Sequence, residues 1–380
     1  MNKLKVIDLF AGCGGLSLGF KKSGFNVLAH VEIDNDCCET LSINASPKEN
    51  IFNIDITDHS NCLKQMKEYG INQIDGIIGG PPCQAYSIAG RNKDENKMDE
   101  DPRNFLFESF DHLLKKFKPN FFIFENVTGM LSAKPFGIDI NEQIFESFMK
   151  SGYFVNKDFR SCVFDMSEFG IPQKRKRVII FGIKKFGNKN YKEIVKSFYE
   201  EMDKKKKKKN QTVRDAIGDL PKILPLKKNG KISHKAISEF TEHSPRFHNK
   251  RDIKIFKLLA RDIESGKNKY TSSQALKEVY KKFTNKESSV HKYNVLRWNE
   301  PSNTIPAHLY KDGLRHIHPD SEQARTITIR EAARLMTFPD NYIFSGSNGS
   351  KYKMLGNAVP PNFSEIIAKA IKKIIPVHWS

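Results

Sequence analysis

The arrangement of apolar runs in the first half of the chain restricts the fold more than any other feature of the sequence. Amphipathic segments with helical spacing, such as Asn104–Phe117 and Asn141–Met149, separate several runs that have the length and composition of strands. Those runs are Lys5–Phe10, Val27–Val31, Asp75–Ile78, Phe121–Glu125 and Val178–Ile183. Alternation of strands with helices is typical of a mostly parallel sheet that helices cover on both faces. The sequence therefore predicts an α/β fold for this half.

The composition of the chain changes after Phe186. Lys204–Lys209 is an unbroken run of six lysines, whose like charges keep it solvated. The stretch from Gln211 to about Gly349 is polar, basic and rich in loops, which predicts a second, smaller and less regular domain. We therefore expect one domain to comprise residues 1–186 plus 350–380, and the other to comprise residues 187–349.

The last segment of the chain regains helical periodicity. Apolar residues recur there at three-and-four spacing, and Ser364 stands where a helix cap is expected. An apolar stripe on a helix needs a partner surface, and we expect that surface to be the sheet of the first domain. The stripe consists of Ile366, Ile367, Ala370, Ile371, Ile374 and Ile375.

The charge of the chain favours a polyanionic partner. Among 380 residues, 63 are Lys or Arg and 44 are Asp or Glu, which gives a net charge of +19. Such an excess is typical of proteins that bind nucleic acid. The six cysteines form no CxxC pair and the histidines are irregularly placed, so no metal site is predicted. No signal peptide or membrane-length apolar run is visible, which predicts a cytoplasmic protein with reduced thiols.

Cys83 lies in the run Gly79-Gly80-Pro81-Pro82-Cys83-Gln84, directly after the predicted strand Asp75–Ile78. Two proline rings fix φ ahead of the thiol, and two glycines allow a sharp turn that side chains would obstruct. Ligands bind at the carboxyl ends of the strands in open α/β sheets. The pattern predicts a rigidly held cysteine at such an end, which indicates a nucleophile.

Further polar positions follow other predicted strands. The glycine-rich turn Asp8–Gly15 comes after the first strand, Glu32 after the second, and Asp55 after another short apolar segment. The turn is not a GxGxxG dinucleotide fingerprint. An acid at a strand end can nevertheless accept hydrogen bonds from ribose hydroxyls, and a second acid can face an adenine edge. Together these positions indicate a nucleoside pocket at one edge of the sheet.

Several motifs occur in the order found in DNA (cytosine-5) methyltransferases, a family that the chain resembles. Besides the opening glycine turn, they are Gly80-Pro81-Pro82-Cys83-Gln84, Phe124-Glu125-Asn126-Val127, Gln173-Lys174-Arg175-Lys176-Arg177, Arg330-Glu331-Ala332-Ala333-Arg334-Leu335-Met336-Thr337-Phe338-Pro339 and Gly356-Asn357-Ala358-Val359. The match thins between about Phe186 and Asn303. The resemblance implies a Rossmann-like methyltransferase sheet that binds S-adenosylmethionine, with S-adenosylhomocysteine as product. It also implies a smaller, irregular target-recognition domain.

The resemblance implies a catalytic set of Cys83, Glu125, Arg175 and Arg177. The thiolate of Cys83 would attack carbon 6 of a cytosine, so that carbon 5 becomes nucleophilic and accepts a methyl group. Glu125 would contact ring nitrogen 3 and the exocyclic amine, and Arg177 the carbonyl oxygen, with Arg175 beside it. Nearby cations would also favour ionisation of the thiol, because an unperturbed cysteine has a pKa of about 8.5.

The same resemblance, taken position by position, implies a cofactor site and DNA contacts. The cofactor site would consist of Phe10, Gly12, Glu32, Ile33, Asp55, Ile56, Pro82, Leu106, Asn357 and Val359. We expect the target base to leave the duplex and a loop from Gln84 to Arg103 to close over it. The DNA contacts would include Ser87, Arg91, Thr304, Arg297 and Arg315.

Two alternatives to DNA methylation stay open. One is cytosine-5 methylation of transfer RNA, against which the long variable region counts. The other is a catalytically silent DNA-binding relative, against which the intact catalytic set counts. A nicotinamide dehydrogenase would leave the Pro-Pro-Cys-Gln run unexplained.

A chain of this size without extra regulatory domains is typical of a bacterial restriction–modification methyltransferase. We expect a monomer that acts on duplex DNA in the cytoplasm and is held near the nucleoid through that DNA. A separately acting cognate restriction endonuclease is a compatible partner, and no membrane is involved.

Overall fold

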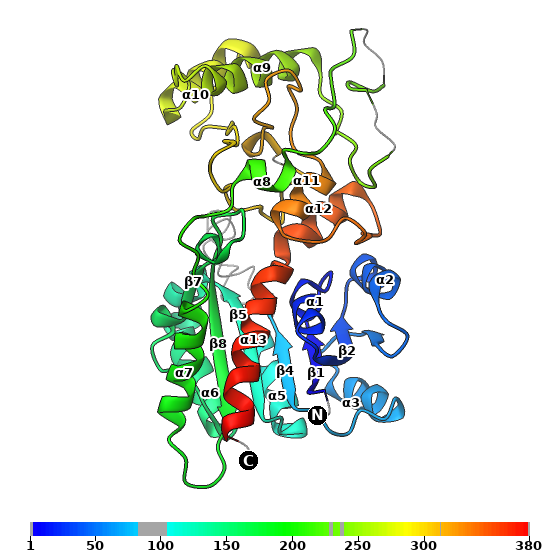
Figure 1. Ribbon diagram of the computed structural model, residues 1–380, viewed down its shortest axis with the longest axis vertical. Coiled ribbons are helices and arrows are strands. Elements are labelled where there is room, and N and C mark those ends of the chain that lie inside the picture. The colour runs from blue at the N-terminus through cyan, green and yellow to red at the C-terminus, as the bar shows by residue number, and fades with distance from the viewer. Residues whose placement is uncertain (1–2, 83–104, 228–230, 236–238, 312, 379–380) are drawn as a thin grey trace. The chain divides into compact units, whose positions relative to one another are not determined.

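The computed structural model describes residues 3–82, 105–227, 231–235, 239–311 and 313–378. It divides into two compact units (Figure 1). The first comprises Met1–Phe169, Arg175–Lys208 and Ala358–Ser380, and the second comprises Gly170–Lys174 and Lys209–Asn357.

The first unit is built on one eight-stranded sheet, in the order β3-β2-β1-β4-β5-β8-β6, with β7 also paired to β8. Strands β1 to β5 run parallel, whereas β6 and β7 pair with β8 antiparallel and β8 pairs with β5 antiparallel. All five predicted strands are confirmed, with ends that differ by one or two residues. The strands are β1 (Lys5–Leu9), β2 (Asn26–Glu32), β3 (Asn50–Asn53), β4 (Gly76–Gly79), β5 (Phe121–Val127), β6 (Tyr153–Phe154), β7 (Val163–Asp165) and β8 (Lys176–Lys184).

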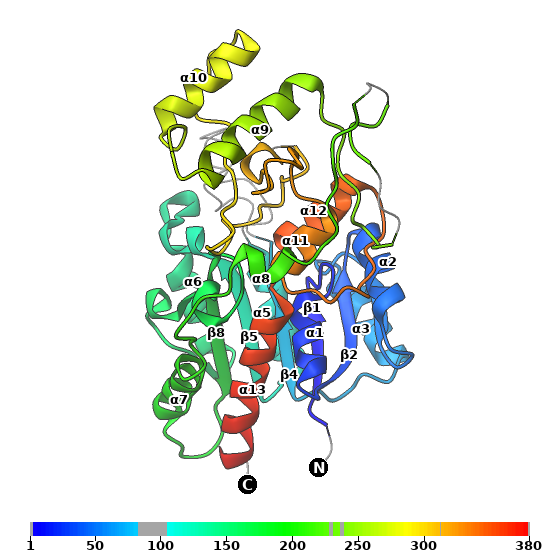
Figure 2. The ribbon, with the colours of Figure 1, turned by 45° about the horizontal axis from the view of Figure 1, so that its top comes forward.

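Helices cover both faces of this sheet, as predicted (Figures 1 and 2). On one face α1, α13 and α7 pack in a row. On the other, apolar residues of α3, α5 and α6 share a core cluster with residues of the central strands. The helices of the unit are α1 (Gly15–Lys22), α2 (Asn35–Asn44), α3 (His59–Glu68), α5 (Leu106–Phe117), α6 (Ile140–Lys150), α7 (Tyr191–Asp203) and α13 (Pro361–His378).

The last helix packs against the first, as the place of Asn357 in the family's cofactor site implies. Ile367, Ala370, Ile371, Ile374 and Ile375 are buried. The prediction for Ser364 was wrong, because α13 begins at Pro361 and encloses it. The Ser364 hydroxyl is buried and donates to the carbonyl of Leu16 in α1 instead of capping its own helix.

The second unit is the less regular one, as predicted. Among its described residues, β-pairing is limited to isolated bridges. Its apolar cluster joins the inner faces of two helices to a few loop residues that include Tyr293 and Ile317. The helices are α8 (Val213–Ile217), α9 (Lys250–Glu264), α10 (Ser273–Thr284), α11 (Ile329–Leu335) and α12 (Asn348–Asn357).

The unit boundaries lie at other residues than those expected. Helix α7, in the stretch 187–208 that we assigned to the second domain, packs on the first unit, where its Phe198 ring stacks on Phe181 of β8 at 4.4 Å. Residues 350–357, assigned to the first domain, belong to the second unit. That the second unit recognises the target remains a prediction. No helix in the described part of the chain is long and apolar enough to cross a membrane.

Candidate active site

The strand order of the first unit reverses beside β1, and this reversal determines where a ligand can bind. From β1 the chain moves outward to β2 and β3, then returns to the other side of β1 with β4 and β5. In open α/β sheets the crevice outside the carboxyl ends of the strands at such a switch point is the usual ligand site. The loop after β1 and the Gly79–Pro82 turn after β4 both emerge there.

Gly80 brings the start of the Pro-Pro-Cys run next to Glu125. A Cβ built on Gly80 would lie 2.5 Å from Oε2 of Glu125, so a side chain at this position would require one of the two groups to shift. Pro81 is buried and Pro82 is exposed. Cys83 lies outside the described residues, three positions after Gly80. The backbone that leads to the predicted nucleophile therefore passes directly beside the predicted acid.

Glu125 is held by an ion pair across two antiparallel strands. It lies in β5 and is 8% exposed. Its Oε1 is 2.9 Å from Nε of Arg177 in β8. Burial raises the pKa of Glu125 above its ordinary value, although Arg177 and Arg175 pull it in the opposite direction. A buried carboxyl with a raised pKa is suited to holding a proton or sharing one with a ligand nitrogen.

Arg175 is fully buried beside this pair. Its guanidinium donates to the carbonyl oxygen of Ala358 at 2.9 Å, so that the segment just before α13 fixes its position. Its positive charge opposes, without cancelling, the rise that burial causes in the pKa of Glu125. Of the four predicted catalytic residues, the structure thus brings Glu125, Arg175 and Arg177 together.

The loop after β1 is shaped by Glu32. Its Oε2 accepts a hydrogen bond from the Gly12 amide at 2.7 Å, and its Oε1 accepts from the amides of Ile33 and Asp34, both at 2.9 Å. Three residues of the loop have left-handed backbone, Phe10 with φ 55°, Gly12 with φ 52° and Gly14 with φ 76°. Such a conformation is uncommon for phenylalanine, and strained residues of this kind cluster at ligand sites.

The residues present fit the nucleoside part of S-adenosylmethionine. A carboxylate offers about four acceptor positions, and the three backbone bonds of Glu32 leave one for a ribose hydroxyl. Ile33 is 63% exposed beside it and offers an apolar surface to a base. Asp55 is exposed and its Oδ1 accepts from the Thr57 amide at 2.9 Å, which leaves its other oxygen available.

The remaining cofactor residues are more scattered. Ile56 and Val359 are buried, and half-buried Leu106 begins α5. Asn357, at the end of α12, is exposed and belongs to the second unit. The structure therefore groups the residues after β1, β2 and β4 at one edge, while the assignment of every residue to a cofactor contact remains a prediction.

The five residues expected to touch DNA have different surroundings. Ser87 and Arg91 lie outside the described residues. Thr304 is exposed and its hydroxyl donates to the carbonyl of Lys174 at 2.6 Å. Arg297 is half-buried and contacts Asn268 and Glu300. Arg315 is also half-buried and donates to the carbonyl of His291 at 3.0 Å, which gives it a structural role in the second unit.

Two positions that belong to the catalytic motifs, or follow them in the sequence, have contacts that sequence reasoning missed. The backbone carbonyl of Ala358 orients Arg175, and no side-chain pattern signals a backbone acceptor. Gln173 is fully buried, and its Oε1 accepts from the amide of Ile305 at 3.2 Å. In the sequence, its place two residues before Arg175 was the one available signal. In the structure, its burial indicates a hydrogen-bonding role, because glutamine is seldom fully buried without one.

Comparison with known proteins identifies the family of the chain. A family model described as C-5 cytosine-specific DNA methylase matches residues 4–373. The Type II methyltransferase M.Bpa9945I of Bacillus paralicheniformis is 33% identical, over 98% of this chain and 99% of that protein. The Type II methyltransferase M1.HphI of Haemophilus parahaemolyticus is 31% identical, over 98% of this chain and 87% of that protein.

Solved structures give the same result. A protein of E. coli described as a DNA modification methyltransferase encoded within a prophage superposes with a TM-score of 0.65 and 27% identity, over 98% of this chain and all of that one. The Dnmt2 methyltransferase of S. pombe superposes with a TM-score of 0.58 at 16% identity, over the whole of both chains, which shows a shared fold alone. The chain therefore belongs to the C-5 cytosine-specific DNA methylase family and is a DNA (cytosine-5) methyltransferase that uses S-adenosylmethionine as methyl donor.

Proposed function

We propose that this enzyme methylates a cytosine within a specific duplex DNA sequence, by flipping the base out of the helix and attacking it with Cys83. The observation that carries the proposal is the position of Glu125. One of its oxygens is bonded to Arg177, and the other faces Gly80 at the start of the Pro-Pro-Cys run. The Gly80 turn brings the start of this run beside Glu125, so Cys83 and Glu125 could contact the same cytosine ring.

The residues have complementary tasks in this reaction. The Sγ–C6 bond forms as the thiolate adds, and negative charge that develops in the ring is drawn toward nitrogen 3. A protonated or hydrogen-bonding Glu125 at nitrogen 3 stabilises that charge, as its raised pKa allows. Arg177 offers N–H groups to the cytosine carbonyl oxygen while it holds Glu125 in place.

S-adenosylmethionine supplies the electrophilic methyl group that carbon 5 attacks. Loss of the proton from carbon 5 and cleavage of the Sγ–C6 bond then restore the aromatic ring and the free thiolate. The chain must also exclude water from the adduct, and the segment after Cys83 is the predicted cover.

A covalent trap tests the proposal directly. A duplex with 5-fluorocytosine at the target position should form a stable adduct with the enzyme and the methyl donor, because fluorine cannot leave carbon 5 as a proton does. The adduct should be absent for Cys83→Ser. Cys37→Ala removes a different, buried thiol in α2 and serves as the matched control. An adduct that persists in Cys83→Ser, or that vanishes only in Cys37→Ala, would refute the assigned nucleophile.

The nucleic acid substrate is tested separately. Label from a tritiated methyl donor should enter duplex DNA and not transfer RNA. Transfer of label to RNA alone would contradict the DNA substrate, and no transfer to either would favour a silent binding protein.

We also propose a restriction–modification role for the protein as a cytoplasmic monomer, with a separate cognate endonuclease. The support is the Type II methyltransferase relatives that match along nearly the whole chain. Bisulfite sequencing of host DNA with and without the gene should reveal one short methylated sequence. Cleavage of unmethylated host DNA at that same sequence in a cell extract would support the endonuclease. Methylation spread over unrelated sequences would contradict the role.

A further inference from the structure

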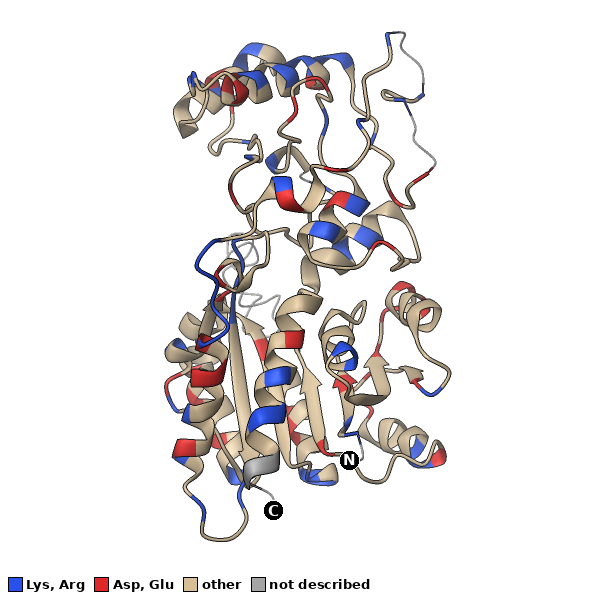
Figure 3. Cartoon of the chain, viewed as in Figure 1, with Lys and Arg blue, Asp and Glu red and all other residues tan. Residues whose placement is uncertain are grey.

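Helix α9 of the second unit carries a straight stripe of cations on its outer face. Four exposed residues, Lys250, Lys254, Lys257 and Arg261, are spaced by four, three and four positions. At 3.6 residues per turn this spacing places all four side chains within an arc of about 60°. The buried residues of α9, which include Phe256 and Leu259, lie on the opposite face. Figure 3 shows the concentration of basic residues along this helix.

Within the described residues the stripe has no neutralising acid. None of its four cations forms an ion pair with another residue in the described part of the chain. The neighbouring Arg251 differs, because its guanidinium pairs with Asp252 at 3.0 Å. Glu264 follows the stripe on the same side, but its Oε1 accepts a hydrogen bond from the amide of Ser321 at 2.9 Å. Four free positive charges on one face raise the electrostatic energy of the folded chain unless an anion approaches them.

The position of Lys250 strengthens this point. It is the first residue of α9, after the cap Asn249. The helix dipole favours acids in a first turn and disfavours cations. A lysine in the first turn therefore does not stabilise the helix itself. An external anion that binds along the whole stripe provides a reason for it.

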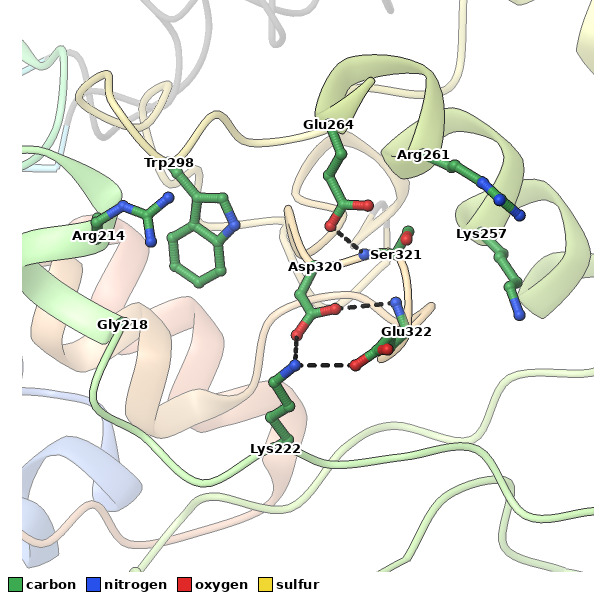
Figure 4. Close-up of a pocket in the computed structure, with 10 residues that line it drawn as sticks. All are labelled: Arg214, Gly218, Lys222, Lys257, Arg261, Glu264, Trp298, Asp320, Ser321 and Glu322. Atoms are coloured by element: carbon green, nitrogen blue, oxygen red, sulfur yellow. Dashed lines mark hydrogen bonds and ion pairs between the residues drawn. The ribbon is translucent and has the colours of Figure 1, made fainter. Parts of the chain in front are cut away.

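The C-terminal half of the stripe borders an open pocket. Lys257 and Arg261 extend side by side from α9 at its edge, and Trp298 and Arg214 line it elsewhere (Figure 4). The Arg214 guanidinium lies over the Trp298 ring, 4.9 Å from its centre. Lys222 is already neutralised by Asp320 and Glu322, at 3.2 Å and 2.9 Å. Among the residues that the structure describes, the cations of this pocket without an acidic partner are therefore those on the α9 side and Arg214.

We propose that the α9 stripe binds the sugar–phosphate backbone of the duplex substrate, with the adjoining pocket receiving a backbone phosphate. The inference rests on the proposed function and adds the surface that holds the DNA. From Lys250 to Arg261 the stripe measures about 16 Å, roughly the rise of five nucleotides in one strand. A regular row of cations suits a regular row of phosphates, and interactions of this kind position the duplex without reading its sequence.

Salt-dependent binding tests the stripe. The variant carries Lys250→Gln, Lys254→Gln, Lys257→Gln and Arg261→Gln. Glutamine is a good helix former, so α9 should remain folded. The control removes the same charge from the lysine run, at Lys205, Lys207, Lys208 and Lys209, which form no ion pair among the described residues. Binding to a fluorescein-labelled duplex with the host target sequence is followed by anisotropy at several salt concentrations, and melting temperatures verify folding.

The stripe variant should bind at least about tenfold more weakly at about 0.1 M salt. The slope of log Kd against log salt should fall by about 0.9 for each phosphate that the variant no longer binds. At saturating DNA its kcat should equal that of the wild type. The control should keep most of the wild-type slope.

Equal decreases of affinity in the stripe variant and the control would show a general charge effect and overturn the proposal. A decrease of affinity for duplex RNA with unchanged affinity for DNA would also overturn it. If the wild type methylates DNA and the stripe variant binds as the wild type does, the α9 assignment fails and the proposed function stands. If the wild type transfers no methyl group to DNA, both fail.

Discussion

The Nε atom of Arg177 lies 2.9 Å from Oε1 of Glu125, across the antiparallel pair of β5 and β8. The arginine comes from the motif that follows β7 and the acid from the end of β5, so the ion pair joins two sequence motifs at the edge of the sheet. It holds the carboxyl by one oxygen and leaves the other toward Gly80. The two oxygens of Glu125 therefore have different neighbours, and substitutions at Glu125 and at Gly80 test the role of the carboxyl in different ways.

Glu125→Gln should remove most of the activity while preserving the fold. The amide has the same shape but cannot carry the proton that stabilises charge at the cytosine nitrogen. Loss of one general acid costs about 10²- to 10⁴-fold in rate. Single-turnover methyl transfer at saturating DNA and methyl donor measures this step. Glu146→Gln, the same change at an exposed ion pair on α6, should leave the rate unchanged. A Glu125→Gln rate within a few-fold of the wild type would exclude the assigned role.

Gly80→Ala should disturb the acid and the approach to Cys83 together. The new methyl group would meet Oε2 of Glu125 at 2.5 Å, a distance that real Cβ atoms do not tolerate. One of the two must move, so we expect a clear loss of kcat with methyl-donor affinity retained. In the double variant with Glu125→Gln the second loss should be much smaller than the first, because residues in contact couple. Fully additive losses would show that Gly80 acts elsewhere.

The fold of the first unit could be predicted closely from the sequence because its signals are local. Apolar runs such as Phe121–Phe124 have all their residues buried in the sheet, so the pattern along the chain and the burial in space coincide. The helix α13 was predicted for the same reason. Ser364 was assigned wrongly because a hydroxyl near the start of a helix can either cap that helix or donate a hydrogen bond to a residue far away in the sequence. The distant partner, the Leu16 carbonyl, leaves no trace in the neighbouring sequence.

The sequence predicted which residues form the site but not which groups surround them. Motif order pointed to Glu125, Arg175 and Arg177, which the structure brings together. The carbonyl of Ala358 beside Arg175 could not be predicted, since any residue carries such an acceptor. The role of Arg315 stays a prediction, because an arginine that binds DNA and one that bonds a nearby carbonyl look alike in a sequence. Variable, loop-rich segments give no period from which burial could be inferred.

Gln173→Leu should destabilise the second unit and impair catalysis. The Gln173 side chain accepts from the Ile305 amide, and the adjacent backbone pairs with Ser302, since the Lys174 amide donates to its carbonyl at 2.8 Å. Leucine would remove the side-chain oxygen that accepts from the buried Ile305 amide, and loss of such a bond costs about 1–3 kcal/mol. Arg175 follows Lys174 directly, so a looser segment should also raise the KM for DNA. Denaturant unfolding and steady-state kinetics measure the two effects.

Gln173→Glu provides the matched test of this position, because it keeps an oxygen for the Ile305 amide. It should retain more stability than Gln173→Leu at a pH where the new acid is protonated. Gln274→Leu, an equivalent change on the exposed side of α10, should alter stability by less than about 0.5 kcal/mol. If Gln173→Leu behaves like Gln274→Leu, the hydrogen bond to Ile305 has no energetic weight.

The second unit should lose stability in mild acid. His318 is buried and its Nδ1 accepts from the Asp320 amide at 3.2 Å, so a proton there would break the bond. Burial and Arg325 lower the pKa of His318 from 6.5 to about 3, and burial lowers the pKa of His316 to about 4. The unfolded chain therefore binds more protons than the folded one as the pH falls from about 6.5 toward 4. Stability must decrease over that range.

The first unit should respond in the opposite sense. His30 is buried between two carboxylates, with its Nε2 2.9 Å from Glu49, and its pKa is raised from 6.5. Its contribution is complete below pH 6.5 and is lost only as the pH rises through the raised value. The pKa of Glu49 is lowered from 4.5 to about 2, so its contribution persists above pH 4.5 and is lost only as the pH falls toward 2. Between pH 6.5 and 4.5 these two groups therefore keep the first unit stable.

Tryptophan fluorescence can separate the two units. The chain has two tryptophans, and in a Trp379→Phe variant only Trp298, which belongs to the second unit, emits. Its urea midpoint should fall between pH 7 and pH 5, whereas unfolding followed by circular dichroism of the sheet-rich first unit should change little. His316→Gln, which cannot take up the proton, should reduce the pH dependence of the Trp298 signal. If the urea midpoint of the His316→Gln variant depends on pH as strongly as that of its parent, groups other than His316 cause the loss of stability in acid.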